Sequence, residues 1–307
     1  MKVWIDPTSL KEDYIHEMIN RLKGNEVTTS LDQASDADIA VMMPHKINPT
    51  FLDQLKKLKY IKLLTAGYNQ VDLAELKKRG IQLLYAKDVF SIQIAEDVIS
   101  KILYINRRLG LYHEYMKESK WQFEAVTHEI FGSTVGIIGA GSIGDEVAKR
   151  LKAFQTKIIG YRRSKINSPY FDEMVHDHKG FEYIVSTSDI LVISIPLTKD
   201  TYHLINEKVF NMMKPNVLIV NVARGEIIDQ DALINALQKK VIRAAALDVT
   251  TPEPLPKDHP LWQQPHLFIT PHQASASPYM HKRMIDEAVD SINCIIEGKT
   301  LDNLVHI

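Results

Sequence analysis

The chain has 307 residues, a formal net charge of −1 and a single cysteine, and 45% of its residues are hydrophobic. This length suits about two domains of about 150 residues, and the near-zero charge gives no basic excess for nucleic acid or an anionic membrane. One cysteine excludes an intrachain disulfide or a cysteine metal cluster. No apolar run reaches the roughly 18 residues of a membrane span, so we expect a cytoplasmic protein that acts on a small molecule and holds no metal.

Short apolar strands alternate with amphipathic helices over the first hundred residues. Strands are predicted at 2–6, 36–43, 60–66 and 81–86. Helices are predicted at 49–58 and 70–80, and Gly80 supplies a C-cap for the second. A single long helix is predicted at 95–118. This alternation predicts a parallel, doubly wound sheet.

A second series of strands follows that helix. Strands are predicted at 134–139, 157–161, 190–196, 216–222, 242–249 and 266–271, and a last helix at 277–298. Their near-continuous apolar runs are typical of strands covered by helices on both faces. The histidines of "HDH" (176–178) have no third ligand nearby in the sequence, so we expect a surface loop there rather than a metal site.

The stretch "GIIGAGSIG" carries Gly139, Gly141 and Gly144 in the spacing G-x-G-x-x-G. Such glycines permit a tight turn, a close approach of the backbone to a pyrophosphate, and close packing of helix on strand. A predicted strand precedes the motif and an amphipathic helix follows it. This context favours a dinucleotide site over a plain glycine-rich turn.

A pair of arginines stands where an NAD site of this kind expects an acid about 20 residues beyond the glycines. No acid occurs between Glu146 and Asp172, and Arg162 and Arg163 follow the strand predicted at 157–161. An arginine cannot accept from ribose hydroxyls but can bind a 2′-phosphate. The hypothesis is therefore NADP(H), with NADPH preferred over NADH. Its binding residues are Arg162, Arg163 and Ser164. The alternative is a solvated basic loop of an NAD protein.

Chemically useful side chains follow three later strands. Arg224 follows 216–222, Asp248 and Glu253 close or follow 242–249, and His272 follows 266–271. Ligands of open α/β sheets bind beyond the carboxyl ends of the strands, so these side chains are expected in one crevice. Singly, each has an ordinary structural alternative, such as a surface ion pair or a capping histidine.

The ordered motifs resemble the D-isomer-specific 2-hydroxyacid dehydrogenases from about residue 36 to residue 298. They are the glycine turn, "IPLT" with Thr201, "NVARG", "LDVTTPEP" and "TPH". The resemblance implies two doubly wound parallel α/β domains, a Rossmann domain inserted in a flavodoxin-like one. Residues 1–99 and 276–307 would form the substrate domain, and 100–275 the dinucleotide-binding domain.

The resemblance also implies roles in hydride transfer between NADP(H) and a 2-keto acid or D-2-hydroxy acid. Arg224 would bind the substrate carboxylate and polarise the keto oxygen. His272 would be the general acid/base, and Glu253 would hydrogen-bond it and favour its protonated form. Asp248 would contact the nicotinamide side of the cofactor.

Further binding positions are implied by the same resemblance. Backbone N–H groups near Ala66 and Gly67 in "LTAGYNQVD" would hold the substrate carboxylate. Cofactor contacts are implied for Gly139, Gly141, Ser142, Ile143, Gly144, Pro196, Thr201, Val222, Ala223 and Asp248. Family members are usually homodimers, with the region around 100–130 at the interface.

Some residues depart from the family pattern and leave the substrate open. Gln273 and Ser275 stand where the family often has Ile-Ala-Gly, so glyoxylate, hydroxypyruvate, pyruvate and larger keto acids all remain candidates. Glu253 replaces the Gln of formate-oxidising relatives and disfavours formate. The alternative function is an NAD(P)-sensing binding module of the corepressor type, which shares this fold.

Overall fold

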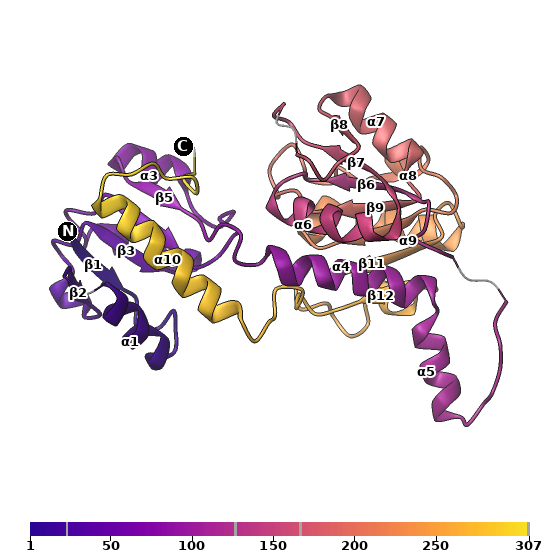
Figure 1. The fold of residues 1–307 in the computed structure, drawn as a ribbon, viewed down its shortest axis with the longest axis horizontal. Helices are drawn as coiled ribbons and strands as arrows, with labels where there is room; N and C mark the ends of the chain where they lie inside the picture. The colour runs from indigo at the N-terminus through magenta and orange to yellow at the C-terminus, as the bar shows by residue number, and fades with distance from the viewer. Residues whose placement is uncertain (23, 126–127, 166–167, 306–307) are drawn as a thin grey trace. The chain divides into compact units, whose positions relative to one another are not determined.

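The computed structural model describes residues 1–22, 24–125, 128–165 and 168–305. The chain divides into two units, which are coloured along the sequence in Figure 1. Unit 1 comprises Met1–Phe90 and Ser277–Ile307, and unit 2 comprises Ser91–Ala276. The chain therefore leaves unit 1, builds unit 2 and returns.

Unit 1 is built on a five-stranded parallel sheet of the described residues, in the order β2-β1-β3-β4-β5. Its strands are β1 (Lys2–Ile5), β2 (Glu26–Thr28), β3 (Ile39–Met42), β4 (Tyr60–Leu63) and β5 (Gln82–Leu84). Its α-helices are α1 (Glu12–Arg21), α2 (Pro49–Leu52), α3 (Leu73–Arg79) and α10 (Met280–Ile296). Because side chains alternate along a strand, Val3 and Ile5 join the core beneath α1 and α10, while Trp4 joins the core on the opposite face. This order is that of flavodoxin-like folds.

Unit 2 is built on a seven-stranded parallel sheet of the described residues, in the order β12-β11-β10-β9-β6-β7-β8. Its strands are β6 (Thr134–Ile138), β7 (Lys157–Tyr161), β8 (Glu173–Val175), β9 (Ile190–Ile193), β10 (Leu218–Asn221), β11 (Ala244–Leu247) and β12 (Leu267–Ile269). Its α-helices are α4 (Ser91–Asn106), α5 (Leu109–Lys117), α6 (Ser142–Leu151), α7 (His178–Thr187), α8 (Glu207–Phe210) and α9 (Gln230–Gln238). The strand order reverses between β6 and β9, which creates the crevice where Rossmann folds bind dinucleotides.

The helices of unit 2 cover both faces of its sheet. Side chains of α7, α8 and α9 share one large apolar core with the strands. Helix α4 packs against α6, β10 and β11 on the other face. Both predicted doubly wound parallel sheets are therefore confirmed. Of the helices within the described ranges, none is long and apolar enough to cross a membrane.

The long helix predicted at 95–118 is wrong, because the structure divides this segment into α4 and α5. The break lies at Arg108, which has a left-handed φ of 51°. Eight residues of α4 are buried, whereas every residue of α5 is at least partly exposed. The apolar periodicity continues past Asn106 in the sequence, but Asn106 is the last residue of this segment that the core of unit 2 buries. Figure 1 shows α5 projecting away from the sheet of unit 2.

Three other sequence expectations differ from the structure. A helix is predicted at 49–58, but α2 ends at Leu52. Leu55 and Leu58 are still buried, because successive turns follow in which each of these N–H groups donates to the carbonyl three residues earlier. That spacing satisfies the same apolar pattern without a longer helix. The short edge strands β2 and β8 were not predicted. The chain passes between the units at 90/91 and 276/277, against predicted domain boundaries at 99/100 and 275/276, since α4 begins at Ser91 and packs within unit 2.

Candidate active site

The glycine turn lies between β6 and α6, at the crevice of unit 2. The N–H groups of Gly139 and Ala140 both donate to the carbonyl of Tyr161, at 3.0 and 3.1 Å. Gly139 has a φ of 112°, and an added Cβ would lie 2.7 Å from the backbone carbon of Ser194. Only glycine therefore fits at this position.

The remaining residues of the turn suit an anionic ligand. An added Cβ at Gly144 would collide with the backbone of Gly139, so this glycine lets α6 pack close to the turn. At Gly141 no described atom lies within 4 Å of an added Cβ, so the backbone there is open to a ligand. Gly141 offers no capping side chain, and α6 begins with Ser142 and Ile143. The first N–H groups of this helix can therefore bind a pyrophosphate.

The arginine pair follows β7 beside this turn. Arg162 is half-buried, and its Nη1 donates to the carbonyl of Ala140 at 3.3 Å. Arg163 is exposed and forms a 2.9 Å ion pair with Asp200, while Ser164 is exposed. The structure thus places the guanidinium of Arg162 against the glycine turn and that of Arg163 on Asp200.

A histidine that the sequence interpretation assigned to a surface loop belongs to this corner of unit 2. His176 follows β8, and its Nδ1 lies 2.9 Å from the backbone carbonyl of Arg162. Asp177 caps α7 through the N–H of Gly180, and His178 begins that helix. The predicted loop is therefore partly helix. Only the pairing of β7 with β8 brings His176 to Arg162.

The loop after β9 is closed by Thr201. Its hydroxyl donates to the carbonyl of Pro196 at 2.8 Å and accepts from the N–H of Thr198 at 2.7 Å. Thr201 is buried and Pro196 is exposed. The structure therefore gives Thr201 a role in shaping the loop that presents Pro196.

Arg224 stands in a turn that Asn221 holds. The buried Asn221 donates from Nδ2 to the carbonyl of Arg224 at 2.9 Å and accepts from the N–H of Ala223 at 3.0 Å. Val222 and Ala223 are buried. An added Cβ at Gly225 would collide with the backbone of Thr250, so this turn closely approaches the loop after β11. Sequence reasoning missed Asn221, whose only signal is a polar residue within an apolar strand.

Glu253 and His272 form a hydrogen-bonded pair. Nδ1 of His272 lies 2.7 Å from Oε2 of Glu253, and Oε1 of Glu253 accepts from the N–H of Thr250 at 3.0 Å. The carboxylate is therefore fixed from both sides. The His272 side chain is 46% exposed, and its Nε2 is the ring atom left for proton exchange with a ligand.

Asp248 organises the turn that carries His272. Its carboxylate accepts from the hydroxyl of Thr270 at 2.6 Å and from the N–H groups of Gln273 and Ala274 at 3.0 and 2.9 Å. Its backbone carbonyl accepts from the N–H of His272 at 2.7 Å. Asp248 is only 2% exposed. Both of its carboxylate oxygens are thus engaged within the protein.

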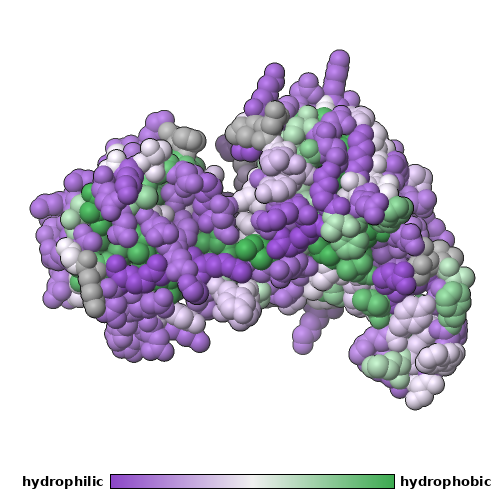
Figure 2. Space-filling model, viewed as in Figure 1, coloured by the Kyte–Doolittle hydropathy of each residue, from purple (hydrophilic) through white to green (hydrophobic). Residues whose placement is uncertain are grey.

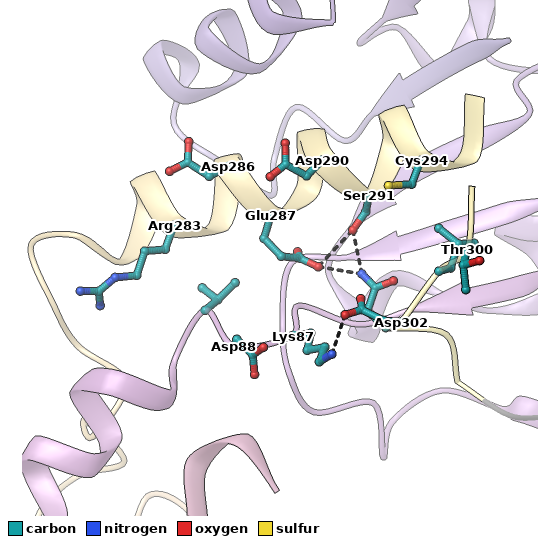
Figure 3. Close-up of a pocket in the computed structure, with 13 residues that line it drawn as sticks. Lys87, Asp88, Arg283, Asp286, Glu287, Asp290, Ser291, Cys294, Thr300 and Asp302 are labelled. Atoms are coloured by element: carbon teal, nitrogen blue, oxygen red, sulfur yellow. Dashed lines mark hydrogen bonds and ion pairs between the residues drawn. The ribbon is translucent and has the colours of Figure 1, made fainter. Parts of the chain in front are cut away.

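Two predicted substrate residues and the cavity of Figure 3 belong to unit 1. Ala66 and Gly67 follow β4, and the carbonyl of Gly67 accepts from the hydroxyl of Thr65 at 2.9 Å. The cavity has a volume of about 390 Å³ and is lined by α10 and by segments 87–89 and 300–303, without any of the predicted site residues (Figure 3). Within unit 2, by contrast, Arg224, Glu253 and His272 all follow neighbouring strands at the same edge of the sheet.

The two α/β units and the glycine turn at the strand reversal define a dinucleotide-binding α/β protein. A family model described as "D-isomer specific 2-hydroxyacid dehydrogenase, NAD binding domain" matches residues 99–274. The chain belongs to this family, as the sequence motifs predicted, and is an oxidoreductase of the D-2-hydroxyacid dehydrogenase type.

Individual relatives agree with this assignment. A glyoxylate reductase of Thermofilum pendens is 33% identical over 273 residues, 86% of this chain and 80% of that protein. A D-3-phosphoglycerate dehydrogenase of Methanocaldococcus jannaschii is 33% identical over 287 residues, 90% of this chain and 53% of that protein. Among solved structures, an acyclic imino acid reductase in complex with NADPH and D-Arg is 28% identical, with a TM-score of 0.84 over 100% of both chains.

Proposed function

We propose that this protein reduces a 2-keto acid to the D-2-hydroxy acid, with NADPH preferred over NADH. The observation that carries the proposal is the 2.7 Å pair of His272 and Glu253, which joins the segments after β12 and β11, and β11 lies next to β10, the strand that ends before Arg224. A histidine held by a carboxylate, beside a guanidinium, is suited to protonating a keto oxygen while the substrate carboxylate is bound.

The bound cofactor would supply the hydride, and the residues present fit it. The open backbone at Gly141 and the first turn of α6 would hold its pyrophosphate. Arg162, Arg163 and Ser164 would hold the 2′-phosphate. Ser142, Ile143, Pro196, Val222 and Ala223 would contact the remainder of the cofactor.

The protein's own residues would then manage charge and the proton. The guanidinium of Arg224 would pair with the substrate carboxylate and stabilise negative charge growing on the keto oxygen. Nε2–H of His272 would donate its proton to that oxygen. Nδ1–H of the neutral ring would still donate to Glu253, which keeps the ring in orientation. Since the imidazole is 46% exposed, solvent can return the proton after product release.

The experiment is a panel of 2-keto acids with NADPH and with NADH, each repeated with ammonia because a solved relative is an imino acid reductase. We expect oxidation of NADPH that depends on the keto acid alone, with a D-2-hydroxy acid as product. If oxidation of NADPH instead requires ammonia, the reaction at this site is reduction of an imine and not of a keto acid. Binding of NADPH without turnover of any substrate would instead favour the NAD(P)-sensing module.

Arg224→Ala tests the substrate role within the same panel. We expect kcat/KM for the best keto acid to fall by about 10³-fold, because a bidentate carboxylate contact and transition-state stabilisation are lost together. The Kd of NADPH should stay within about threefold of the wild-type value. Near-wild-type turnover in this variant would refute the assigned role.

We also propose a homodimer formed through α5 and the segment after it. Large hydrophobic side chains are exposed there, namely Met116 (66%), Trp121 (105%), Phe123 (82%) and Phe131 (64%). Figure 2 shows hydrophobic residues among polar ones over α5 and beside it, at the lower right. Such a patch marks an interaction site in an otherwise polar surface. Sedimentation should give a dimer for the wild type and a monomer for Trp121→Glu, Phe123→Glu, and a wild-type monomer would overturn the proposal.

A further inference from the structure

Helix α4 carries a stripe of polar side chains on the face that packs within unit 2. Gln93, Asp97 and Lys101 are spaced at i, i+4 and i+8, so they lie above one another on one side of the helix. Gln93 is 6% exposed and Lys101 only 1% exposed. Burying a charge or an amide is costly unless it is paired, so this stripe needs partners.

Those partners all lie in or beneath the turn that carries His272. Nε2 of Gln93 donates to the carbonyl of Ser275 at 3.2 Å. Asp97 accepts from Nε2 of Gln273 at 2.9 Å, and its other oxygen accepts from Lys101. The side chain of Gln273 is thus bound to α4, while its backbone N–H is bound to Asp248.

Lys101 lies between two carboxylates. It forms an ion pair with Asp97 and lies 3.6 Å from Oδ1 of Asp248. Burial raises the pKa of the Asp97 carboxyl, against the opposing effect of the Lys101 ammonium. Without this cation, the carboxylate of Asp97 and the buried carboxylate of Asp248 would repel each other with no positive charge between them. Their repulsion would then act on Asp248, whose carboxylate holds the hydroxyl of Thr270 and the N–H groups of Gln273 and Ala274.

The turn itself needs such support. His272 has a φ of 51°, which residues with a side chain rarely adopt and which persists only where the surroundings over-determine it. Asp248 binds the N–H groups of Gln273 and Ala274, the two residues that follow the histidine. The position of the Asp248 carboxylate therefore bears on the position of the imidazole.

We propose that Lys101, together with Asp97 and Gln273, is a positioning residue that holds His272 in place for proton transfer. None of the three acts on the substrate; Lys101 holds the carboxylates of Asp97 and Asp248 together, and Asp97 ties the turn to α4 through Gln273. The inference rests on the proposed function in one respect, because His272 must be the proton donor for its position to affect turnover.

The kinetic test compares two buried lysines. Lys101→Met keeps the length of the side chain and removes its charge, and Lys62→Met does the same to a lysine of unit 1 that is 0% exposed and pairs with Glu287 at 2.6 Å. We expect Lys101→Met to lower kcat of keto acid reduction about 10- to 100-fold, as for a small misplacement of a reacting group. KM for NADPH should change less than about twofold. Lys62→Met should lower only Tm.

Two further variants separate charge from packing. In Lys101→Met, Asp97→Asn one carboxylate is removed with the cation, so we expect kcat to recover at least fivefold over Lys101→Met alone. The pH profile of kcat should gain an ionisation in Lys101→Met that the double variant lacks, because the pKa of Asp97 rises further without the lysine. The charged groups of the turn and its supports are Glu253, Asp248, Asp97 and Lys101, and the proposed site adds Arg224. Gln273→Met, at an exposed position, should lower kcat a few-fold with no loss of folding. No recovery, or a Lys101→Met variant that only melts earlier, would overturn the proposal.

Hydrogen exchange gives a reading that does not depend on turnover. The N–H groups of Gln273 and Ala274 should exchange at least tenfold faster in Lys101→Met and at the wild-type rate in Lys62→Met. Unchanged protection in Lys101→Met would overturn the positioning role even if every keto acid were reduced. Faster exchange in a protein that reduces no substrate would support it while the proposed function fails.

Discussion

Arg162→Ala is the sharpest test of the cofactor proposal, because the structure distinguishes the two arginines of the pair. Arg162 is half-buried and its guanidinium already lies against the glycine turn, with Nη1 3.3 Å from the carbonyl of Ala140. Arg163 is 67% exposed and paired with Asp200. A 2′-phosphate would meet Arg162 in place, whereas Arg163 would first have to leave its partner.

The magnitudes follow from these surroundings. A hydrogen bond to a charged group contributes about 1.5–3 kcal/mol, which at about 1.4 kcal/mol per factor of ten is roughly a 10- to 100-fold effect. We expect this loss of kcat/KM for NADPH in Arg162→Ala. An exposed ion pair contributes about 0–1 kcal/mol. Arg163 would exchange its ion pair with Asp200 for a contact with the 2′-phosphate and gain little. Arg163→Ala should therefore lower kcat/KM for NADPH by less than about fivefold.

The assay measures kcat/KM for NADPH and for NADH at a saturating concentration of the best keto acid. Lys165→Ala is the matched control, since it removes one positive charge from the same exposed segment. Arg162→Ala should leave the value for NADH within about threefold, and Arg162→Asp should shift the preference toward NADH. The reasoning is refuted if Arg163→Ala costs more than Arg162→Ala, or if both cofactors lose equally.

Two glycines and one buried acid give further predictions. Gly141→Ala should keep the wild-type Tm but raise the KM of NADPH at least tenfold, because its Cβ would enter the open space meant for the pyrophosphate. Gly225→Ala should instead lower the free energy of unfolding by about 2 kcal/mol or more, since its Cβ collides with the backbone of Thr250; an unchanged Tm would contradict this. Burial opposes ionisation of Asp6, but the Lys46 ammonium at 2.6 Å and the hydrogen bonds from Ser9 and Thr8 together outweigh it, so the pKa of this carboxyl is lowered. A lowered pKa contributes stability above the ordinary value of about 3.9 that is lost as the pH falls through the folded-state value. Asp6→Asn should therefore lower the free energy of unfolding, measured with urea, by about 2 kcal/mol at pH 7 and by progressively less below about pH 4. An equal loss at pH 3 would show that the stabilisation does not come from the charge of Asp6.

Local sequence patterns determined much of the fold and the chemistry. The glycine turn could be predicted because its requirements are local: a positive φ at Gly139 and open backbone at Gly141. Strands of near-continuous apolar residues predicted the parallel sheets. Arg224, Glu253 and His272 were predicted to share one crevice because each follows a strand, and parallel strands end at a common edge of the sheet. The sequence by itself therefore determined the family, the two sheets and the residues expected in the crevice.

Tertiary structure alone decided how those residues are supported. The break between α4 and α5 depends on where the core of unit 2 ends, which no local pattern marks. Gln273 meets Asp97 across 176 residues of sequence, and His176 meets Arg162 only through the pairing of β7 with β8. In the sequence, Lys101 is one polar residue in an apolar helix. In the folded protein it lies between the carboxylates of Asp97 and Asp248. Such contacts join segments distant in sequence, and burial sets their energies, so they appear only once the chain is folded.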